Sequence, residues 1–197
     1  MKRLFITVLM TIGIMIPLAA VAATPLATVE VQVNKVLDVL RDPSLKGEAK
    51  KKLRQDRIRE ISEKMFDFTE LSRRTLAQNW NALNDGQKKE FVDLYKAILE
   101  KAYVDKIMSY TDEKIVFQKE SPLSEKTSEV QTMVITKKAE IPINYRVIQK
   151  DDGWRVYDVV VEGVSLVNNY RSQFREILIN KTPDDLLETL RKKVGKT

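Results

Sequence analysis

The chain contains no histidine and no cysteine among its 197 residues. Their absence excludes Ser-His-Asp and Cys-His catalysis, disulfide bonds, and zinc or haem sites that depend on either residue. The sequence also lacks a phosphate-cradling G-x-x-x-x-G-K-[ST] loop, so ATP hydrolysis is not expected. We therefore predict no metal site and no cofactor.

Only one long apolar run is present, and it lies at the N-terminus. Two basic residues precede the apolar stretch 4–18, and small residues follow it at Ala20 and Ala22. This order is typical of a signal peptide that is removed during export. An uncleaved membrane anchor is the alternative, but the run is short for a bilayer span. We expect a signal peptide over residues 1–22 and one exported domain over residues 23–197.

The formal net charge is +6, and the basic residues are clustered rather than evenly spread. The clusters lie at residues 50–59, 73–74 and 191–193. Such clusters attract anionic headgroups or acidic partners. Acidic residues interleave with the first cluster, which is the pattern of a solvated helix face, and we favour this interpretation. No nucleic-acid motif is present, so nucleic-acid binding is not predicted.

The N-terminal half of the exported domain has helical periodicity. Apolar residues recur every three or four positions, and the longest such face runs from Phe91 to Ile107. A turn signal at residues 84–87 and candidate caps at Asp67 and Thr69 mark helix starts. The pattern predicts four helices, whose apolar stripes run over residues 29–40, 53–65, 71–80 and 91–107.

Beyond the last of these helices the apolar period changes to two, which is typical of strands. The pattern predicts strands over residues 114–120, 129–137, 140–150 and 154–162. A long hairpin loop is expected at 121–128 and a tight turn at 151–153, while Pro142 suggests a strand edge or a bulge. Ser165 and Thr182 then cap two C-terminal helices. Helices, then antiparallel strands, then helices define an α+β domain.

Two carboxylates in the last strand form the candidate catalytic pair. Asp158 and Glu162 are four residues apart, so they share one face of a strand. Their spacing is compatible with a general acid and a general base. In the structural alternative, Asp158 pairs with a neighbouring arginine or a backbone donor, while Glu162 lies at the strand end. We favour this alternative because no third catalytic group accompanies the pair.

The last strand and the helix after it carry the most specific pattern in the chain. Three consecutive valines, at 159–161, make both faces of the strand apolar, which alone indicates only packing. The segment 153–174 (GWRVYDVVVEGVSLVNNYRSQF), however, resembles the C-terminal signature of the toluene-tolerance family of MlaC-type periplasmic phospholipid carriers. Three further segments are similar to the same family, in the same order: 66–71, 87–91 and 99–103.

The resemblance implies a single domain with a curled antiparallel sheet of four strands, related to NTF2-like folds and enclosing an apolar pocket. It implies a periplasmic carrier of diacyl phospholipids, which we expect to be a monomer. It also implies docking to an outer-membrane lipoprotein complex and to an inner-membrane ABC transporter complex with an MCE subunit.

The expected lipid-binding residues lie on the inward strand face and on the helices opposite it. Strand alternation together with the resemblance gives this set: Leu99, Tyr103, Ile107, Val116, Val134, Ile143, Tyr145, Val156, Val159, Val161 and Val167. Arg171 and Arg175 are candidates for contacting a phosphate group, with solvated positions as the alternative.

Three functions follow from these patterns. The leading hypothesis is a non-enzymatic phospholipid carrier. The second is an NTF2-like periplasmic enzyme that uses Asp158 and Glu162. The third is a protein-binding adaptor with a solid core, which would lack the apolar chamber that the first hypothesis requires.

Overall fold

The computed structural model describes residues 23–110 and 113–195. The signal peptide expected over residues 1–22 lies outside these described residues. Along the described chain, helices come first, then an antiparallel sheet, then two more helices. This order confirms the predicted α+β class.

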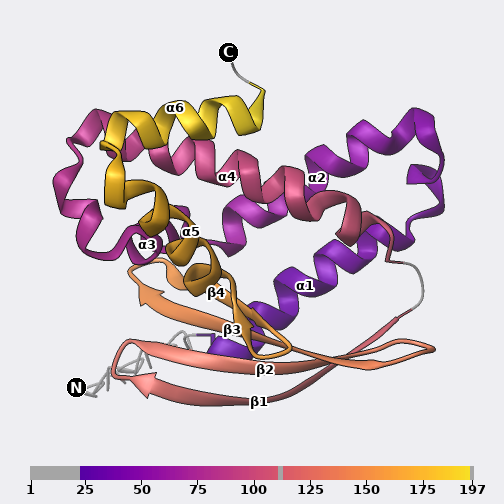
Figure 1. Ribbon diagram of the computed structural model, residues 1–197. Helices are drawn as coiled ribbons and strands as arrows, with labels where there is room; N and C mark the ends of the chain where they lie inside the picture. The colour runs from indigo at the N-terminus through magenta and orange to yellow at the C-terminus, as the bar shows by residue number, and fades with distance from the viewer. Residues whose placement is uncertain (1–22, 111–112, 196–197) are drawn as a thin grey trace, which may run out of the picture.

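Figure 1 shows an open, curled sheet with α1 directly against one of its faces, while α3 and α5 contact β4. The α-helices are α1 (Pro25–Arg41), α2 (Lys51–Met65), α3 (Phe68–Leu76), α4 (Asp85–Met108), α5 (Leu166–Asn180) and α6 (Pro183–Val194). Three short 3-10 segments are η1 (Pro43–Leu45), η2 (Glu48–Lys50) and η3 (Ala77–Ala82). The strands are β1 (Lys114–Ser124), β2 (Thr127–Ile135), β3 (Glu140–Lys150), β4 (Gly153–Val161) and β5 (Val164–Ser165), in the spatial order β1-β2-β3-β4-β5.

Local capping residues explain where several helices begin. The Asp67 carboxylate accepts a hydrogen bond from the backbone N–H of Glu70 and caps α3. Asn84 forms a capping box with Gln87 at the start of α4. Ser165 and Thr182 cap α5 and α6. Each cap satisfies a backbone donor that the first helical turn leaves unpaired, so these starts are readable from the sequence.

Two expectations about element ends are corrected. The connection between β1 and β2 is a two-residue turn, because the strands extend to Ser124 and from Thr127. Pro122 fits inside β1 because β1 is an edge strand and needs hydrogen bonds on one side only. The helix expected to reach residue 80 ends at Leu76, where Ala77 takes φ 50° and ψ −122° and the chain continues as η3.

Pro142 lies in β3, which is an interior strand rather than an edge. Its carbonyl accepts a hydrogen bond from the backbone N–H of Glu162, just beyond the end of β4. A residue in an antiparallel strand directs its N–H and C=O to the same side. The missing N–H of Pro142 therefore faces Glu162, just beyond the end of β4, so the ladder lacks a bond only at its end.

The apolar residues gather in two separate cores. The helical core joins α3, α4, α5 and α6 and contains these buried residues: Leu71, Leu76, Leu83, Phe91, Leu94, Tyr95, Leu99, Val167, Phe174, Leu186, Leu187 and Leu190. The sheet core joins α1 to the sheet through Val29, Val33, Leu37, Met65, Val130, Val147 and Val156. Within the described residues, no helix is long and apolar enough to cross a membrane.

Candidate functional site: the inner face of the sheet

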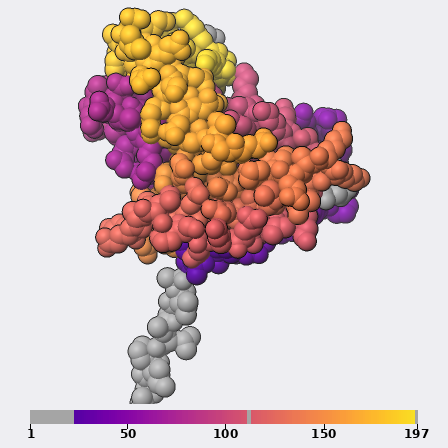
Figure 2. All heavy atoms as spheres, turned by 60° about the horizontal axis from the view of Figure 1, so that its bottom comes forward, coloured from indigo at the N-terminus to yellow at the C-terminus, as the bar shows by residue number. Residues whose placement is uncertain are grey.

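Strand register defines which side chains share the sheet face that α1 covers. Val130 lies opposite Tyr145, and Tyr145 lies opposite Val159 on the next strand. Residues directly opposite one another in a sheet share a face. Because Val130 packs against α1, we call this side the inner face. Figure 2 shows the opposite, outer face, where no helix covers β1 to β3 in that view.

Six of the eleven predicted lipid-binding residues lie together on the inner face. They are Val134, Ile143, Tyr145, Val156, Val159 and Val161, placed there by the β2–β3 and β3–β4 registers. Val134 and Val156 are buried, while Ile143, Tyr145 and Val159 are half-buried and Val161 is 38% exposed. These six residues come from β2, β3 and β4, and they form one apolar surface on the inner face.

The structure does not bring the other five residues to this face. Val116 is opposite Met133, so it lies on the outer face. Leu99 and Val167 are buried in the helical core, and Tyr103 packs against its margin. Ile107 is near the end of α4 and is 37% exposed. Only Val116 was expected on the inward strand face; the other four were expected on helices opposite the sheet, and they do lie on α4 and α5.

Several inner-face residues were missed by the sequence analysis. Ile115 and Phe117 share the inner face with Val134, and they pack against the sheet core together with Tyr110 and Trp154. Alternation gave a usable signal, because Ile115 and Phe117 are separated by one residue. The signal was ambiguous because Val116 between them is also apolar.

Two tyrosines bring hydroxyl groups to the inner face. Burial raises the pKa of the Tyr145 hydroxyl to about 12, with a further contribution from Tyr110. Burial also raises the pKa of Tyr110, whose hydroxyl is enclosed and has no hydrogen-bond partner within the described part of the chain. Tyr145 is nevertheless only half-buried by surface area. Protein therefore surrounds its hydroxyl, while another part of the side chain remains accessible.

The outer face carries a polar network instead. Arg146 donates to Glu129 at 3.1 Å and to Asp158 at 3.3 Å. Asp158 also accepts from the Ser165 hydroxyl at 2.7 Å and from the backbone N–H of Val167 at 3.0 Å. The carboxylate therefore ties β4 to the start of α5 and is saturated with structural partners, which confirms the structural interpretation of Asp158.

Glu162, the other member of the candidate catalytic pair, is exposed and lies beyond the end of β4. It adopts φ 49° beside Gly163 at φ 82°, the positive-φ pair expected of a tight hairpin turn. The two carboxylates therefore occupy different environments, one buried in a network and one on a turn. This arrangement does not form a shared acid–base site.

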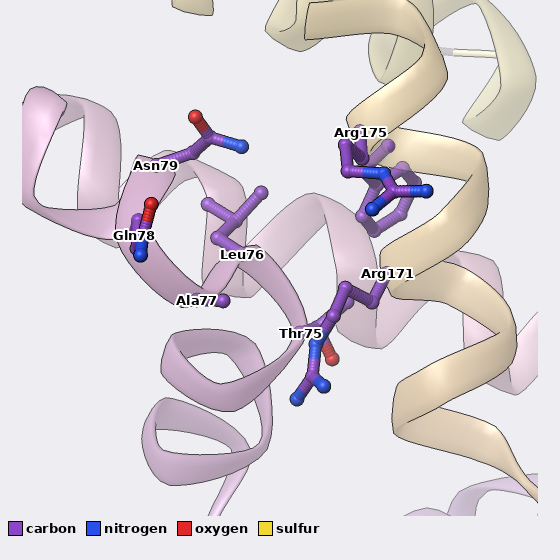
Figure 3. Close-up of a pocket in the computed structure, with 8 residues that line it drawn as sticks. Thr75, Leu76, Ala77, Gln78, Asn79, Arg171 and Arg175 are labelled. Carbon is purple, nitrogen blue, oxygen red and sulfur yellow. The ribbon is translucent and has the colours of Figure 1, made fainter.

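A further pocket of about 400 Å³ lies between the α3–η3 junction and α5 (Figure 3). Its lining residues are Thr75, Leu76, Ala77, Gln78, Asn79, Arg171, Phe174 and Arg175. None of the eleven predicted lipid-binding residues lines it. The pair Arg171 and Arg175, considered from the sequence as a phosphate contact, does meet there.

The fold and the inner face define the class of protein: an α+β domain in which α1 packs against the apolar inner face of an open antiparallel sheet. The family model described as MlaC protein matches residues 30–192, and the chain belongs to that family. A solved structure of a phospholipid-binding protein from Ralstonia solanacearum, in complex with a phospholipid, has a similar fold. The TM-score is 0.77 at 20% identity, covering 88% of this chain and 98% of the other.

Proposed function

We propose that this chain binds a phospholipid by laying its acyl chains against the inner face of the sheet. Family membership supports this proposal, and so does the fold shared with a protein that was solved with a phospholipid bound. The observation that carries it is the group of half-buried apolar side chains on the inner face, namely Ile143, Tyr145 and Val159. An apolar face that helices cover but do not seal is suited to an apolar ligand.

The energy of transferring a lipid explains why such a face is needed. Two acyl chains contain about 30 methylene groups, each worth roughly 0.8 kcal/mol when buried. Exposing both chains to water would therefore cost on the order of 20 kcal/mol. A carrier removes most of this cost only if apolar side chains replace the membrane around both chains. The bound state must also remain close in free energy to the bilayer, so that the lipid can leave again.

The direct test is native mass spectrometry of protein purified without detergent. We expect a co-purifying diacyl phospholipid in the wild-type protein. Val159→Glu places a charge on the inner face and should abolish the bound lipid. Val116→Glu is the matched control, because Val116 is also a half-buried valine in the same sheet but lies on the outer face.

Thermal unfolding of both variants separates lost binding from lost folding. If Val159→Glu unfolds, Ile143→Trp offers a second test, because it fills the inner face without adding charge. Lipid-free wild-type protein that takes up no lipid from vesicles would refute the proposal. Equal lipid loss in the Val159 and Val116 variants would show that the inner face is not the binding surface.

We further propose that the bound lipid is carried through the periplasm and is not chemically altered. Removal of the expected signal peptide, residues 1–22, would deliver the carrier to that compartment. On this proposal it meets an outer-membrane lipoprotein complex on one side and an inner-membrane ABC transporter complex with an MCE subunit on the other. The saturated hydrogen bonding of Asp158 supports a carrier over an enzyme.

A transfer assay tests this finer proposal. Donor and acceptor vesicles separated by a filter should exchange labelled phospholipid only when the protein is present, and the lipid should be recovered intact. Embedding each membrane complex in its own vesicle should accelerate exchange. Recovery of a hydrolysed or modified lipid would contradict the carrier and would favour the enzymatic alternative.

A further inference from the structure

A second candidate ligand site lies away from the inner face, in the pocket between η3 and α5. Figure 3 shows Gln78 and Asn79 on one side of the opening and Arg171 and Arg175 on the other. The floor is apolar, because Phe174 is buried in the helical core. The pocket therefore combines an apolar base with a rim of hydrogen-bond donors.

The charge of the lining is positive and is not compensated within it. Arg171 uses two of its guanidinium donors on the backbone carbonyl of Arg74, at 2.7 and 3.1 Å, which fixes its orientation. Arg175 makes no ion pair or side-chain hydrogen bond with any described residue, and no carboxylate lines the pocket. A fixed guanidinium beside an unpaired one favours an oxyanion, which each can bind by charge-assisted hydrogen bonds.

The neutral rim residues extend the same donor surface. The side-chain amides of Gln78 and Asn79 have no hydrogen-bond partner in the described part of the chain. Each amide group supplies two N–H donors. An oxyanion between the two sides of the pocket would therefore be met by donors from both η3 and α5.

The backbone immediately before Gln78 is strained. Ala77 adopts φ 50° and ψ −122°, a combination that suits glycine and is costly for a residue with a side chain. Such a conformation persists only where the surrounding structure enforces it, and strain of this kind gathers at ligand-binding sites. In this chain the strained peptide is part of the pocket lining.

We propose that this pocket binds a phosphate ester. A volume of about 400 Å³ exceeds what a bare phosphate fills and falls in the range of small-molecule sites, so an apolar or glycerol substituent can rest on the floor. The ester can come from a soluble glycerol phosphate or from the headgroup of an anionic lipid at a membrane surface. The site shares no residue with the inner face, so it stands independently of the proposed carrier function.

The test is a titration of the whole protein with glycerol 3-phosphate, followed by NMR of backbone amides. Amides of residues 75–79 and 171–175 should shift. Arg175→Ala should weaken binding about tenfold, the loss expected for one charge-assisted hydrogen bond. Arg57→Ala, an exposed arginine on α2, is the matched control and should leave binding unchanged. Unmoved amides in the wild-type protein, or equal weakening by both variants, would overturn the proposal.

Vesicles identify the source of the phosphate. Binding to phosphatidylglycerol vesicles, but not to phosphatidylcholine vesicles, that Arg175→Ala abolishes and Arg57→Ala keeps would assign the ester to a lipid headgroup. Binding of the free ester without such vesicle binding would assign it to a soluble ligand. Arg175→Ala should retain the co-purifying phospholipid, so the pocket and the inner face are judged by separate measurements.

Discussion

The two cores of this domain are built from different side chains. In the helical core four aromatic rings interlock, with Phe91, Tyr95, Tyr170 and Phe174 centroids 5.1 to 5.7 Å apart. In the sheet core small valines pack against α1, while larger apolar residues around them stay half-buried. The hydrophobic effect stabilises both regions, and in the sheet core we propose that the half-buried apolar side chains also contact a ligand.

The largest expected effect is in the helical core. Phe91 is fully buried among aromatic rings, so Phe91→Ala should cost about 3–5 kcal/mol of the free energy of unfolding. Ile143 on the inner face is half-buried, so Ile143→Ala should cost only about 1–2 kcal/mol. Urea unfolding of both variants measures the difference directly.

This pair of variants tests whether the helical core and the inner face differ in how tightly they are packed. Equal costs would mean that the inner face is packed as tightly as the helical core, and the binding proposal would lose its structural basis. Measuring both variants after lipid extraction matters, because bound lipid stabilises the folded state and would inflate the apparent cost at Ile143.

The next effect concerns the junction between the two regions. Asp158 is 2% exposed and holds β4 to the first turn of α5 through Ser165 and Val167. Asp158→Ala leaves these donors and one N–H group of Arg146 without their acceptor, although Arg146 keeps its bond to Glu129, and we expect a loss of about 2–4 kcal/mol. Arg146 is partly exposed, so water can replace some of what it loses.

Unfolding measured by urea checks this value, and Glu162→Ala is its control. Glu162 is exposed, and its backbone N–H rather than its side chain bonds to Pro142, so truncating the side chain should change stability little. A stable Asp158→Ala protein would show that the network is dispensable and that a buried carboxylate is kept for another reason.

How far the sequence predicted the structure depends on how local the deciding interactions are. Helix starts were predicted well, because Asp67, Asn84, Ser165 and Thr182 bond to backbone groups only a few residues away. The end of α3 was not predicted. Nothing in the sequence around Ala77 marks the strained backbone that stops the helix, because the packing that enforces it is tertiary.

The candidate site shows the same contrast between local patterns, which the sequence predicts, and tertiary contacts, which it does not. Strand alternation placed Ile143, Tyr145 and Val159 on one face correctly. It failed for Val116, because three apolar residues in a row fit either face and only the register with β2 decides between them. Val167 was expected on a helix that faces the sheet, and it lies in the first turn of α5, buried in the helical core.

A smaller effect should appear as a pH dependence at the edge of the helical core. Burial alone would raise the pKa of Glu70, but hydrogen bonds from Arg73 and Arg74 outweigh it and hold the pKa below its usual value. A carboxylate with a depressed pKa in the folded state stabilises the fold above its unfolded pKa. This stability is lost as the pH falls through the lower, folded pKa.

Glu70→Gln should therefore cost about 1–2 kcal/mol at neutral pH, a value reduced because both arginines are partly exposed. The difference from wild type should shrink below about pH 4, where Glu70 becomes protonated in the unfolded chain first. Unfolding curves between acid and neutral pH measure it. A difference that does not change with pH would mean that the ion pairs contribute nothing beyond packing.

The smallest expected effect on stability comes from a strained backbone position beside the helical core. Ala77 is held at φ 50° and ψ −122°, a conformation that costs about 1–3 kcal/mol for a non-glycine residue. Glycine relieves this strain but adds about 0.4–1 kcal/mol of conformational entropy to the unfolded chain. Ala77→Gly should therefore stabilise the protein by about 1 kcal/mol, measured as a shift in the urea midpoint.

Gln78→Gly is the control, since it adds the same unfolded-state entropy without relieving strain at Ala77, and it should destabilise. Stabilisation by Ala77→Gly would show that the helical core tolerates a strained peptide at the rim of the η3–α5 pocket. A loss of stability would instead show that the Ala77 methyl group contributes more by packing than its backbone loses by strain.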